Sequence, residues 1–562
     1  MKTIEDFECH FDNFFYKASL TTKNKHLALW RVLTVFEDVA FMVYNQYLQS
    51  NDDARKYLEE LKASDFMDKY KFFLKYALIR IEKECTDLSI CEVDQLFNGK
   101  VYRQITKTFK RSELYRMICL HFIAIKSGAA EASINNKKIS IKYKRNHEKH
   151  TFLQYTGYLK LEDDDKGRHG LEVVTRLLTK RDPQLTGKAE SVCHMEGIKP
   201  CYDIEWDVIK KIYEEVSPSL IELPDDWEFP WSSLKDFRTF SRALSAINAY
   251  HIFMNFVATK KFNIRGGGVE NRLLIIGEDK LTLIINNLTN LPEEIIKKII
   301  TALTYGSGVN NPDPALQPLI PYNENYILSP FSITTLNFER NALSLHIRTN
   351  KKDFDSKSSA FEKKMTENFI SQIRGRFKLK SPFYLKKSKG GEIDVVLVEE
   401  QSKTIAICEL KWMITPADPN EILNKIKESD HKIEQAINKA TEAHKQIPYI
   451  LERFDIKSSK EGWKIYPFAI FDGFPGVESF EGKETVALPQ NIFFMILNSC
   501  YSLGVFCDFI TKGTWLPLEG IHYLNHVNTY TFGGLQFEIQ RVEMLDLTDY
   551  MFSYIPYRIN ED

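Results

Sequence analysis

Two short apolar segments, residues 392–399 and 404–411, constrain this chain more than any other part of its sequence. Both are rich in β-branched and aliphatic side chains, and the polar segment Glu400–Lys403 separates them. Short apolar runs on either side of a polar turn predict two strands of an antiparallel hairpin. Closing this hairpin on Glu399 and Thr404 sets its register, because facing residues then have numbers with a constant sum.

The predicted register places Asp394 and Glu409 opposite each other on one face, with Cβ atoms about 5 Å apart. Two carboxylates at this distance repel, so one must hold a proton or a cation must lie between them. Hard oxygen ligands suit Mg²⁺ or Mn²⁺. Lys411 lies on the same face as Glu409, where it can orient an attacking water or stabilise an anionic transition state. The structural alternative is a buried Asp–Glu–Lys network of ion pairs.

Asp394, followed by Glu409-Leu410-Lys411 on the next strand, resembles the PD-(D/E)xK nuclease superfamily, which has the restriction-endonuclease-like fold. The resemblance implies a metal-dependent nuclease. It makes Asp394 and Glu409 ligands of Mg²⁺ or Mn²⁺, and it makes Lys411 the catalytic lysine. Ile393 stands where the family name has a proline, which is a weak part of the pattern.

The flanking segments match the superfamily's order of helix, three strands, helix and strand. The helix expected to begin at Ser359 places Glu362 where the family often has a further acidic residue and metal ligand, although Ser359-x-x-Glu362 is also a capping box. On a helix expected from about residue 430 to 446, Gln435 resembles a glutamine that many members place near the site. A solvated helix face is the alternative for Gln435. A fourth strand is expected at 463–471.

A basic stretch without acidic residues lies between the predicted helix and the hairpin. Aromatic residues are interleaved with its positive charges, a composition that suits contact with a phosphate backbone. A solvated basic loop is the alternative. The candidate nucleic-acid-binding residues are Arg374, Arg376, Lys378, Lys386, Lys387 and Lys389.

The whole chain predicts a multidomain α+β protein. At about 150 residues per domain, its 562 residues suggest three or four domains. We expect a helical domain at 1–130, a mixed α/β recognition or regulatory region at 131–350, a nuclease domain with a mixed sheet flanked by helices at 351–510, and a β-rich extension packing on it at 511–562. Alternating patterns predict strands at 139–143 and 155–161, and a helix is expected from Leu234 to about Phe262.

Composition bears on partners and compartment. The 75 basic and 76 acidic residues nearly cancel, so any nucleic-acid surface must be a local patch. An odd number of scattered cysteines and an acidic start after Met1 predict a cytoplasmic protein. The uncharged residues 485–507 could span a bilayer, but their proline, asparagine and glycine residues favour a buried helix with a flanking loop, and no membrane association is expected. Cys193, His194 and Cys201 lack the CxxC pair of a zinc site.

Together these features predict a Mg²⁺-dependent endonuclease acting on DNA rather than RNA. The resemblance implies a role in bacterial restriction or anti-phage defence, and a homodimer or higher homo-oligomer, because family members often dimerise to cut both strands. Two alternatives stay open: a non-cleaving nucleic-acid-binding or scaffold protein that keeps the fold, and an RNA-cutting effector. The intact set of Asp394, Glu409 and Lys411 argues against the first, because a pure binder needs no buried charge triad.

Overall fold

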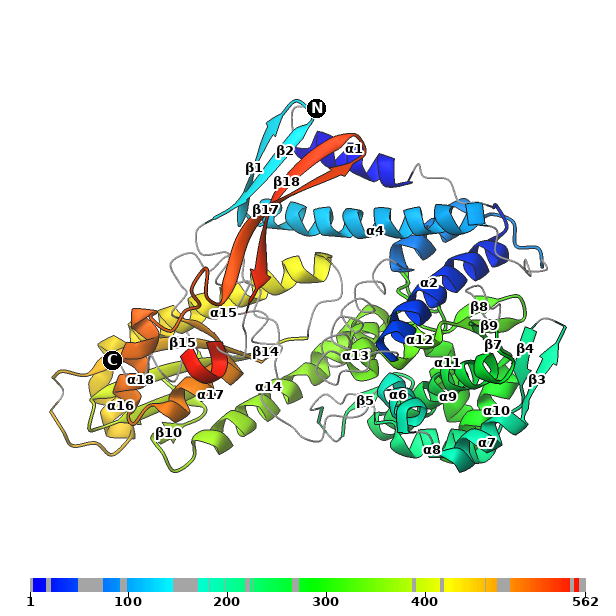
Figure 1. The fold of residues 1–562 in the computed structure, drawn as a ribbon. Helices are drawn as coiled ribbons and strands as arrows, with labels where there is room; N and C mark the ends of the chain where they lie inside the picture. The colour runs from blue at the N-terminus through cyan, green and yellow to red at the C-terminus, as the bar shows by residue number, and fades with distance from the viewer. Residues whose placement is uncertain are drawn as a thin grey trace. The chain divides into compact units, whose positions relative to one another are not determined.

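The chain forms two compact units in a computed structural model (Figure 1), and each unit is assembled from separate segments of the sequence. The sheet unit comprises Met1–His10, Met117–Asp163 and Lys357–Asp562, and the helical unit comprises Phe11–Arg116 and Asp164–Ser356. The multidomain α+β class is confirmed. The structure describes residues 4–16, 22–48, 74–90, 99–144, 170–180, 182–197, 199–217, 223–224, 226–264, 272–386, 391–414, 419–459, 461–472, 486–545 and 550–554.

A five-stranded mixed sheet is the centre of the sheet unit. Its strand order is β10-β13-β14-β15-β16, in which β13 runs antiparallel to both neighbours while β14, β15 and β16 are parallel. The strands are β10 (Lys378–Lys380), β13 (Val395–Glu399), β14 (Thr404–Trp412), β15 (Lys464–Asp472) and β16 (Ala487–Pro489). The short hairpin of β11 (Phe383–Tyr384) and β12 (Glu392–Ile393) precedes β13.

The predicted hairpin and its register are confirmed. Glu399 faces Thr404, and the ladder continues without a bulge to the pair of Val395 and Cys408. The polar segment between the strands forms the turn, with Lys403 at a positive φ of 49°. The fourth strand is also confirmed, because β15 covers nearly all of the segment predicted at 463–471.

Helices cover both faces of this sheet, as a parallel region with apolar residues on both sides requires. On one face, Leu397, Ala406 and Cys408 pack with α14 (Lys351–Ile373), α17 (Gln490–Ser499) and α18 (Leu503–Lys512). On the other face, alternate residues such as Ile405 and Ile407 pack with α15 (Pro419–Lys445) and α16 (Ile447–Arg453). Since β14 alternates, Glu409 belongs to the α15 face.

A second sheet joins chain segments that are remote in sequence. Its order is β1-β2-β18-β17, and β2 pairs in parallel with β18, with Lys138 opposite Gln536 (Figure 1). The strands are β1 (Ala130–Asn135), β2 (Lys138–Tyr143), β17 (Tyr523–Phe532) and β18 (Leu535–Met544), and the π-helical turn η1 (Tyr550–Tyr554) follows. The strand predicted at 139–143 is confirmed within β2, whereas the one predicted at 155–161 lies outside the described residues.

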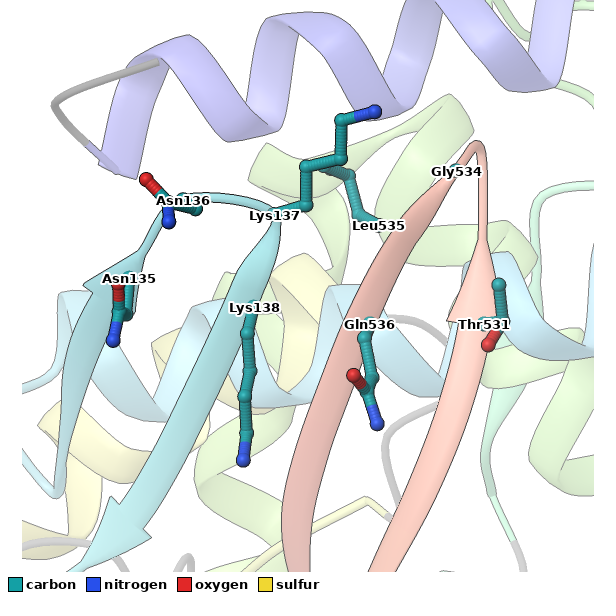
Figure 2. A pocket seen from close by; sticks show the side chains of 8 residues that line it. All are labelled: Asn135, Asn136, Lys137, Lys138, Thr531, Gly534, Leu535 and Gln536. Carbon is teal, nitrogen blue, oxygen red and sulfur yellow. The ribbon is translucent and has the colours of Figure 1, made fainter.

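The tips of the two hairpins in this second sheet enclose a shallow hollow of about 540 Å³ (Figure 2). Its lining is polar and contains none of the residues that the sequence marks as candidates for catalysis. The lining residues are Asn135, Asn136, Lys137, Lys138, Thr531, Gly534, Leu535 and Gln536.

The helical unit is organised around one long buried helix, α9 (Leu234–Lys261), which confirms the helix predicted from Leu234. Its Ala and Ser residues let neighbouring helices approach closely, and α6, α8, α10 and α12 pack against it. Further elements of this unit are α2 (Lys25–Leu48), α6 (Gly170–Lys180), α7 (Pro183–Ser191), α8 (Trp206–Glu215), α10 (Glu278–Thr289), α11 (Glu293–Leu303), α12 (Pro330–Thr334), α13 (Phe338–Thr349), β3 (Cys193–Glu196), β4 (Lys199–Tyr202), β5 (Glu228–Phe229), β6 (Ser232–Ser233), β7 (Leu274–Ile276), β8 (Ile320–Tyr322) and β9 (Asn325–Leu328).

Helices α1 (Ile4–Tyr16), α4 (Gly99–Lys126) and α14 each contain residues of both units. Over the described residues, no helix combines the length and the apolar character that crossing a membrane requires. The uncharged segment that includes residues 490–507 instead contributes α17 and the first half of α18 to the core of the sheet unit.

Candidate functional site

The hairpin brings Asp394 and Glu409 together at one end of the five-stranded sheet. Asp394 lies in the bend between β12 and β13, and Glu409 lies within β14, one pair beyond the last rung of the ladder. The Oδ2 atom of Asp394 accepts a hydrogen bond of 2.7 Å from the backbone N–H of Leu410. This bond holds the Asp394 carboxylate against the neighbouring strand.

Glu409 is the most deeply buried charge of the site. Its side chain is 0% exposed, whereas that of Asp394 is 26% exposed. Its Oε1 atom forms an ion pair of 2.7 Å with Lys439, which also donates to the backbone carbonyl of Glu392 at 2.5 Å. Its Oε2 atom is also buried, and the Lys432 ammonium lies 2.8 Å from it.

Lys432 connects the two carboxylates. Its Nζ atom lies 2.9 Å from Asp394 Oδ2 and 2.8 Å from Glu409 Oε2, and its side chain is 15% exposed. Burial opposes the charged form of Lys432, but the two neighbouring carboxylates outweigh burial and raise its pKa above the ordinary value. Lys432 is therefore an ammonium at neutral pH.

Helix α15 contributes Lys432 and Lys439, which the sequence reasoning did not assign to the site. Gln435, which was expected near the site from the same helix, has its amide 2.9 Å from the His431 ring. The spacing of the two lysines was the available signal: seven residues are two helical turns, so they share one face. Buried Ile433, Ala436 and Ala440 beside them show that this side of the helix faces the sheet.

Lys411 and Glu362 form a second ion pair, of 2.7 Å, with side-chain exposures of 29% and 50%. Helix α14 begins at Lys351, so Ser359 lies inside it and the capping-box interpretation of Glu362 is wrong. The preceding residue, Phe361, stacks on Trp412 with ring centroids 4.1 Å apart. This stacking contact holds α14 against the end of β14 and so places Glu362 beside Lys411.

Whether the site suits a metal depends on Asp394 and Glu409. Over the parts of the chain that the structure describes, no group of three or more His, Cys, Asp or Glu side chains is arranged to hold a metal ion. Glu362, paired with Lys411, does not complete such a group. Mg²⁺ commonly binds through one or two carboxylates, with water and substrate phosphate supplying the remaining ligands. Glu409 Oε2 and Asp394 Oδ2 already share one cation, the Lys432 ammonium at 2.8 and 2.9 Å, so this pair of oxygens fits such a two-carboxylate site.

The predicted nucleic-acid-binding residues do not act as one group. Arg376 donates to the carbonyl oxygens of Leu497 and Cys500, so it supplies hydrogen bonds to backbone acceptors at the C-terminal end of α17. Lys378 lies 3.9 Å from Glu400 Oε2, and Arg374 is exposed.

The second half of the basic stretch lies beside β11. Lys386 is exposed, and its ammonium lies 4.9 Å from the centre of the Tyr449 ring. Its backbone N–H donates to the Gln446 side chain at 2.8 Å. Lys387 and Lys389 lie outside the described residues.

Two cysteine-containing segments are structural. Cys408 is fully buried on the sheet face opposite the carboxylates, and burial raises the pKa of its thiol, which stays protonated. Cys201 lies directly opposite His194 in the hairpin of β3 and β4, and burial likewise raises the pKa of the neighbouring Cys193 thiol, to about 11.

The chemistry available at the end of β14 is a pair of carboxylates, Glu409 buried and Asp394 partly exposed, that can accept a cation, with the positive charge of Lys411 at its edge. Such a set can stabilise an anionic substrate or transition state. Searches against protein-family models, curated proteins and solved structures each returned no match for this chain.

Proposed function

We propose that the protein is a metal-dependent nuclease of the PD-(D/E)xK type, with its centre at Asp394, Glu409 and Lys411. The observation that supports the proposal most is the fully buried Glu409 carboxylate, which shares the Lys432 ammonium with the Asp394 carboxylate. Burying a charge in this way is costly and adds little net stability, so a functional reason for it is expected.

The order of elements around the site supports the same proposal. Helix α14 precedes the β10, β13 and β14 strands, and α15 then connects β14 to the parallel strand β15. This succession of a helix, three strands, a helix and a strand is similar to the order that the resemblance to the restriction-endonuclease-like fold implies. The carboxylates lie at the end of the hairpin, as the resemblance implies.

The residues have separate roles in the proposed reaction. Asp394 and Glu409 would hold Mg²⁺ or Mn²⁺, which would supply Lewis-acid polarisation of the scissile phosphate and help to generate the nucleophile. Lys411, partly exposed at the strand end, orients the attacking water or neutralises the phosphate charge. Glu362 positions Lys411, and Lys439 holds the Glu409 carboxylate in place.

We propose DNA as the substrate and bacterial restriction or anti-phage defence as the context, in both cases from the resemblance. Cleavage as a homodimer and a cytoplasmic location belong to the same proposal.

Plasmid cleavage tests the proposal directly. With Mg²⁺ or Mn²⁺ the wild type should cut the plasmid, and EDTA should stop the cleavage. Asp394→Asn and Lys411→Met should reduce the cleavage rate by a factor of about 10² or more. Lys363→Met is a matched control, because this α14 lysine is 80% exposed and lies 4.0 Å from Glu367. It should cut like the wild type. Equal cleavage by the wild type and Lys411→Met would refute the assignment.

A non-cleaving nucleic-acid-binding protein is the second candidate. The favouring observation is that Lys432 and Lys439 neutralise both carboxylates without a metal. This candidate predicts DNA or RNA binding by fluorescence anisotropy in EDTA, with no cleavage after metal is added. Running DNA and RNA side by side also separates the proposed enzyme from an RNA-cutting effector.

A further inference from the structure

We propose that Lys432 is a built-in cation that occupies the metal position of the metal-free protein and must leave before an ion can bind Asp394 and Glu409. The inference deepens the proposed function and rests on it. It makes Lys432 a positioning residue that controls access to the carboxylate pair.

The contacts of Lys432 carry the inference. One nitrogen atom lies within hydrogen-bond distance of one oxygen from each carboxylate, at 2.9 Å from Asp394 and 2.8 Å from Glu409. A Mg²⁺ ion held by these two oxygens would lie about 2.0–2.1 Å from each. The ammonium and the ion would therefore need the same space and the same oxygen atoms.

Lys439 offers a natural comparison, since it lies on the same helix and is similarly buried, at 12% exposed against 15% for Lys432. It contacts the other oxygen of Glu409 and the carbonyl of Glu392, and it has no ion pair with Asp394 in the described contacts. An ion between Asp394 and Glu409 leaves these contacts intact. Only Lys432 has to be displaced.

The arrangement gives the metal-free protein a physical advantage. Without a cation, Asp394 and Glu409 would repel each other in a buried setting. Lys432 removes this repulsion, so the end of the sheet stays folded before a metal arrives. Its cost is weaker metal binding, because each binding event must also break the Lys432 contacts. The displaced ammonium, on a flexible four-carbon stem, can then reach an anionic substrate.

Lysine labelling tests the displacement without measuring catalysis. The wild-type protein is treated with acetic anhydride in EDTA and again with saturating Mn²⁺, and acetylation is quantified for each lysine by peptide mass spectrometry. Mn²⁺ should raise the labelling rate of Lys432 about tenfold or more, because its ammonium is released to solvent. Lys439 should keep its rate in both conditions.

Calorimetry supplies the second measurement. Mn²⁺ should bind Lys432→Met about tenfold or more tightly than the wild type, since no ammonium has to leave. Lys439→Met removes one charge at a similar place but no competitor, so its gain in affinity should be clearly smaller. Equal gains in both variants would mean that charge alone matters, and would overturn the inference.

The outcomes separate the inference from the proposed function. If Mn²⁺ binds the wild type and Lys432 keeps its labelling rate, the inference is wrong and the proposed function stands. An equal rise at Lys432 and Lys439 would mean that the whole of α15 moves, which also overturns the inference. If neither the wild type nor Lys432→Met binds Mn²⁺, the proposed function fails and the inference fails with it. If Lys432→Met does not fold, labelling of the wild type decides alone.

Discussion

Glu409 is the residue on which the site depends, because a fully buried carboxylate is tolerated only while cations stay close to it. Two lysines from one helix meet this requirement, one at each oxygen atom. Glu409 therefore links the stability of the sheet end to the chemistry that we propose there.

Removing Lys439 should weaken the fold of the sheet unit. In Lys439→Met the buried Oε1 atom of Glu409 loses its 2.7 Å partner, so we expect a loss of about 1–3 kcal/mol in the free energy of unfolding. Urea unfolding followed by circular dichroism measures it. The control is Lys445→Met, because Lys445 is 64% exposed in its pair with Glu442 and should contribute less than about 0.5 kcal/mol. Equal losses in the two variants would contradict the role given to Lys439.

The Lys411–Glu362 pair predicts a catalytic effect with little change in stability, because Glu362 is half exposed. Glu362→Gln should lower the rate of plasmid cleavage about 10–100-fold, since Lys411 loses the partner that orients it. Glu367→Gln, on the same helix and 64% exposed, should cleave at the wild-type rate. An unchanged rate in Glu362→Gln would remove Glu362 from the site.

The sequence predicted those site residues whose positions follow from the local geometry of the hairpin. The pairing of Glu399 with Thr404 is enough to bring Asp394 towards Glu409, since a two-stranded register follows from its turn. Lys432 and Lys439 were not predicted, because their position depends on how α15 rotates against the sheet. That rotation is set by packing of Ile433 and Ala436, which the local pattern does not specify.

The turn of the β13–β14 hairpin is hydrogen-bonded to helix α18. The Glu399 carboxylate accepts from the backbone N–H of Leu503 at 3.0 Å, at the first turn of α18. Gly504 follows, and a Cβ atom there would lie 2.7 Å from the Cβ atom of Ser402. The turn and the helix can approach this closely only because residue 504 has no side chain.

Gly504→Ala should therefore destabilise the sheet unit by about 1–3 kcal/mol, because either the turn or α18 must shift. Thermal unfolding measures the loss. Gly187→Ala, in helix α7, is the control, since a Cβ atom there meets nothing within 4 Å. A helical glycine replaced in open space should gain about 0.5–1 kcal/mol. An unchanged stability of Gly504→Ala would show that the turn or α18 can shift without a measurable cost in free energy.

Helix boundaries were less predictable than strands. Helix α14 begins at Lys351, before the expected start at Ser359. Helix α15 has 27 residues and begins at Pro419, whereas the expected helix began at about residue 430. Both helices carry long charged stretches that weaken the apolar pattern marking a helix in a sequence. Phe354 and Ile426, which are both buried, lie in the parts of α14 and α15 that precede the expected helix starts.

At the scale of the whole molecule, the helical unit carries its own pH dependence. Glu37 is 1% exposed; it accepts from the Ser329 hydroxyl and from the Phe331 N–H, and burial raises its pKa to about 8. The folded form therefore keeps Glu37 protonated well above the pH at which the unfolded chain ionises it, near 4.5. Its contribution to stability is complete below that pH and is lost as the pH rises towards 8.

Glu37→Gln should remove this dependence, because the amide is neutral at every pH. Relative to the wild type, the variant should gain stability between about pH 5 and pH 8.5, measured as the difference in melting temperature of the helical unit. A difference that stays constant across this range would show that Glu37 does not titrate in this way.

The division of the chain into two units, each built from separate segments, could not be predicted from the sequence. Lys138 pairs with Gln536 although nothing in the sequence of either segment indicates the other as its partner. The sequence of each hairpin alone predicts only an ordinary exposed pair of strands. Local patterns therefore predict the strands but not their partners.

The parallel pairing of β2 with β18 has a consequence for how the protein is made. Ser140 bonds to Glu538 across 398 positions of the chain, so a nascent polypeptide carries β2 for most of its synthesis before its neighbour leaves the ribosome. The helical unit is complete much earlier and can fold first, as N-terminal modules generally do during translation. The four-stranded sheet can therefore be completed only when synthesis of the polypeptide is nearly finished.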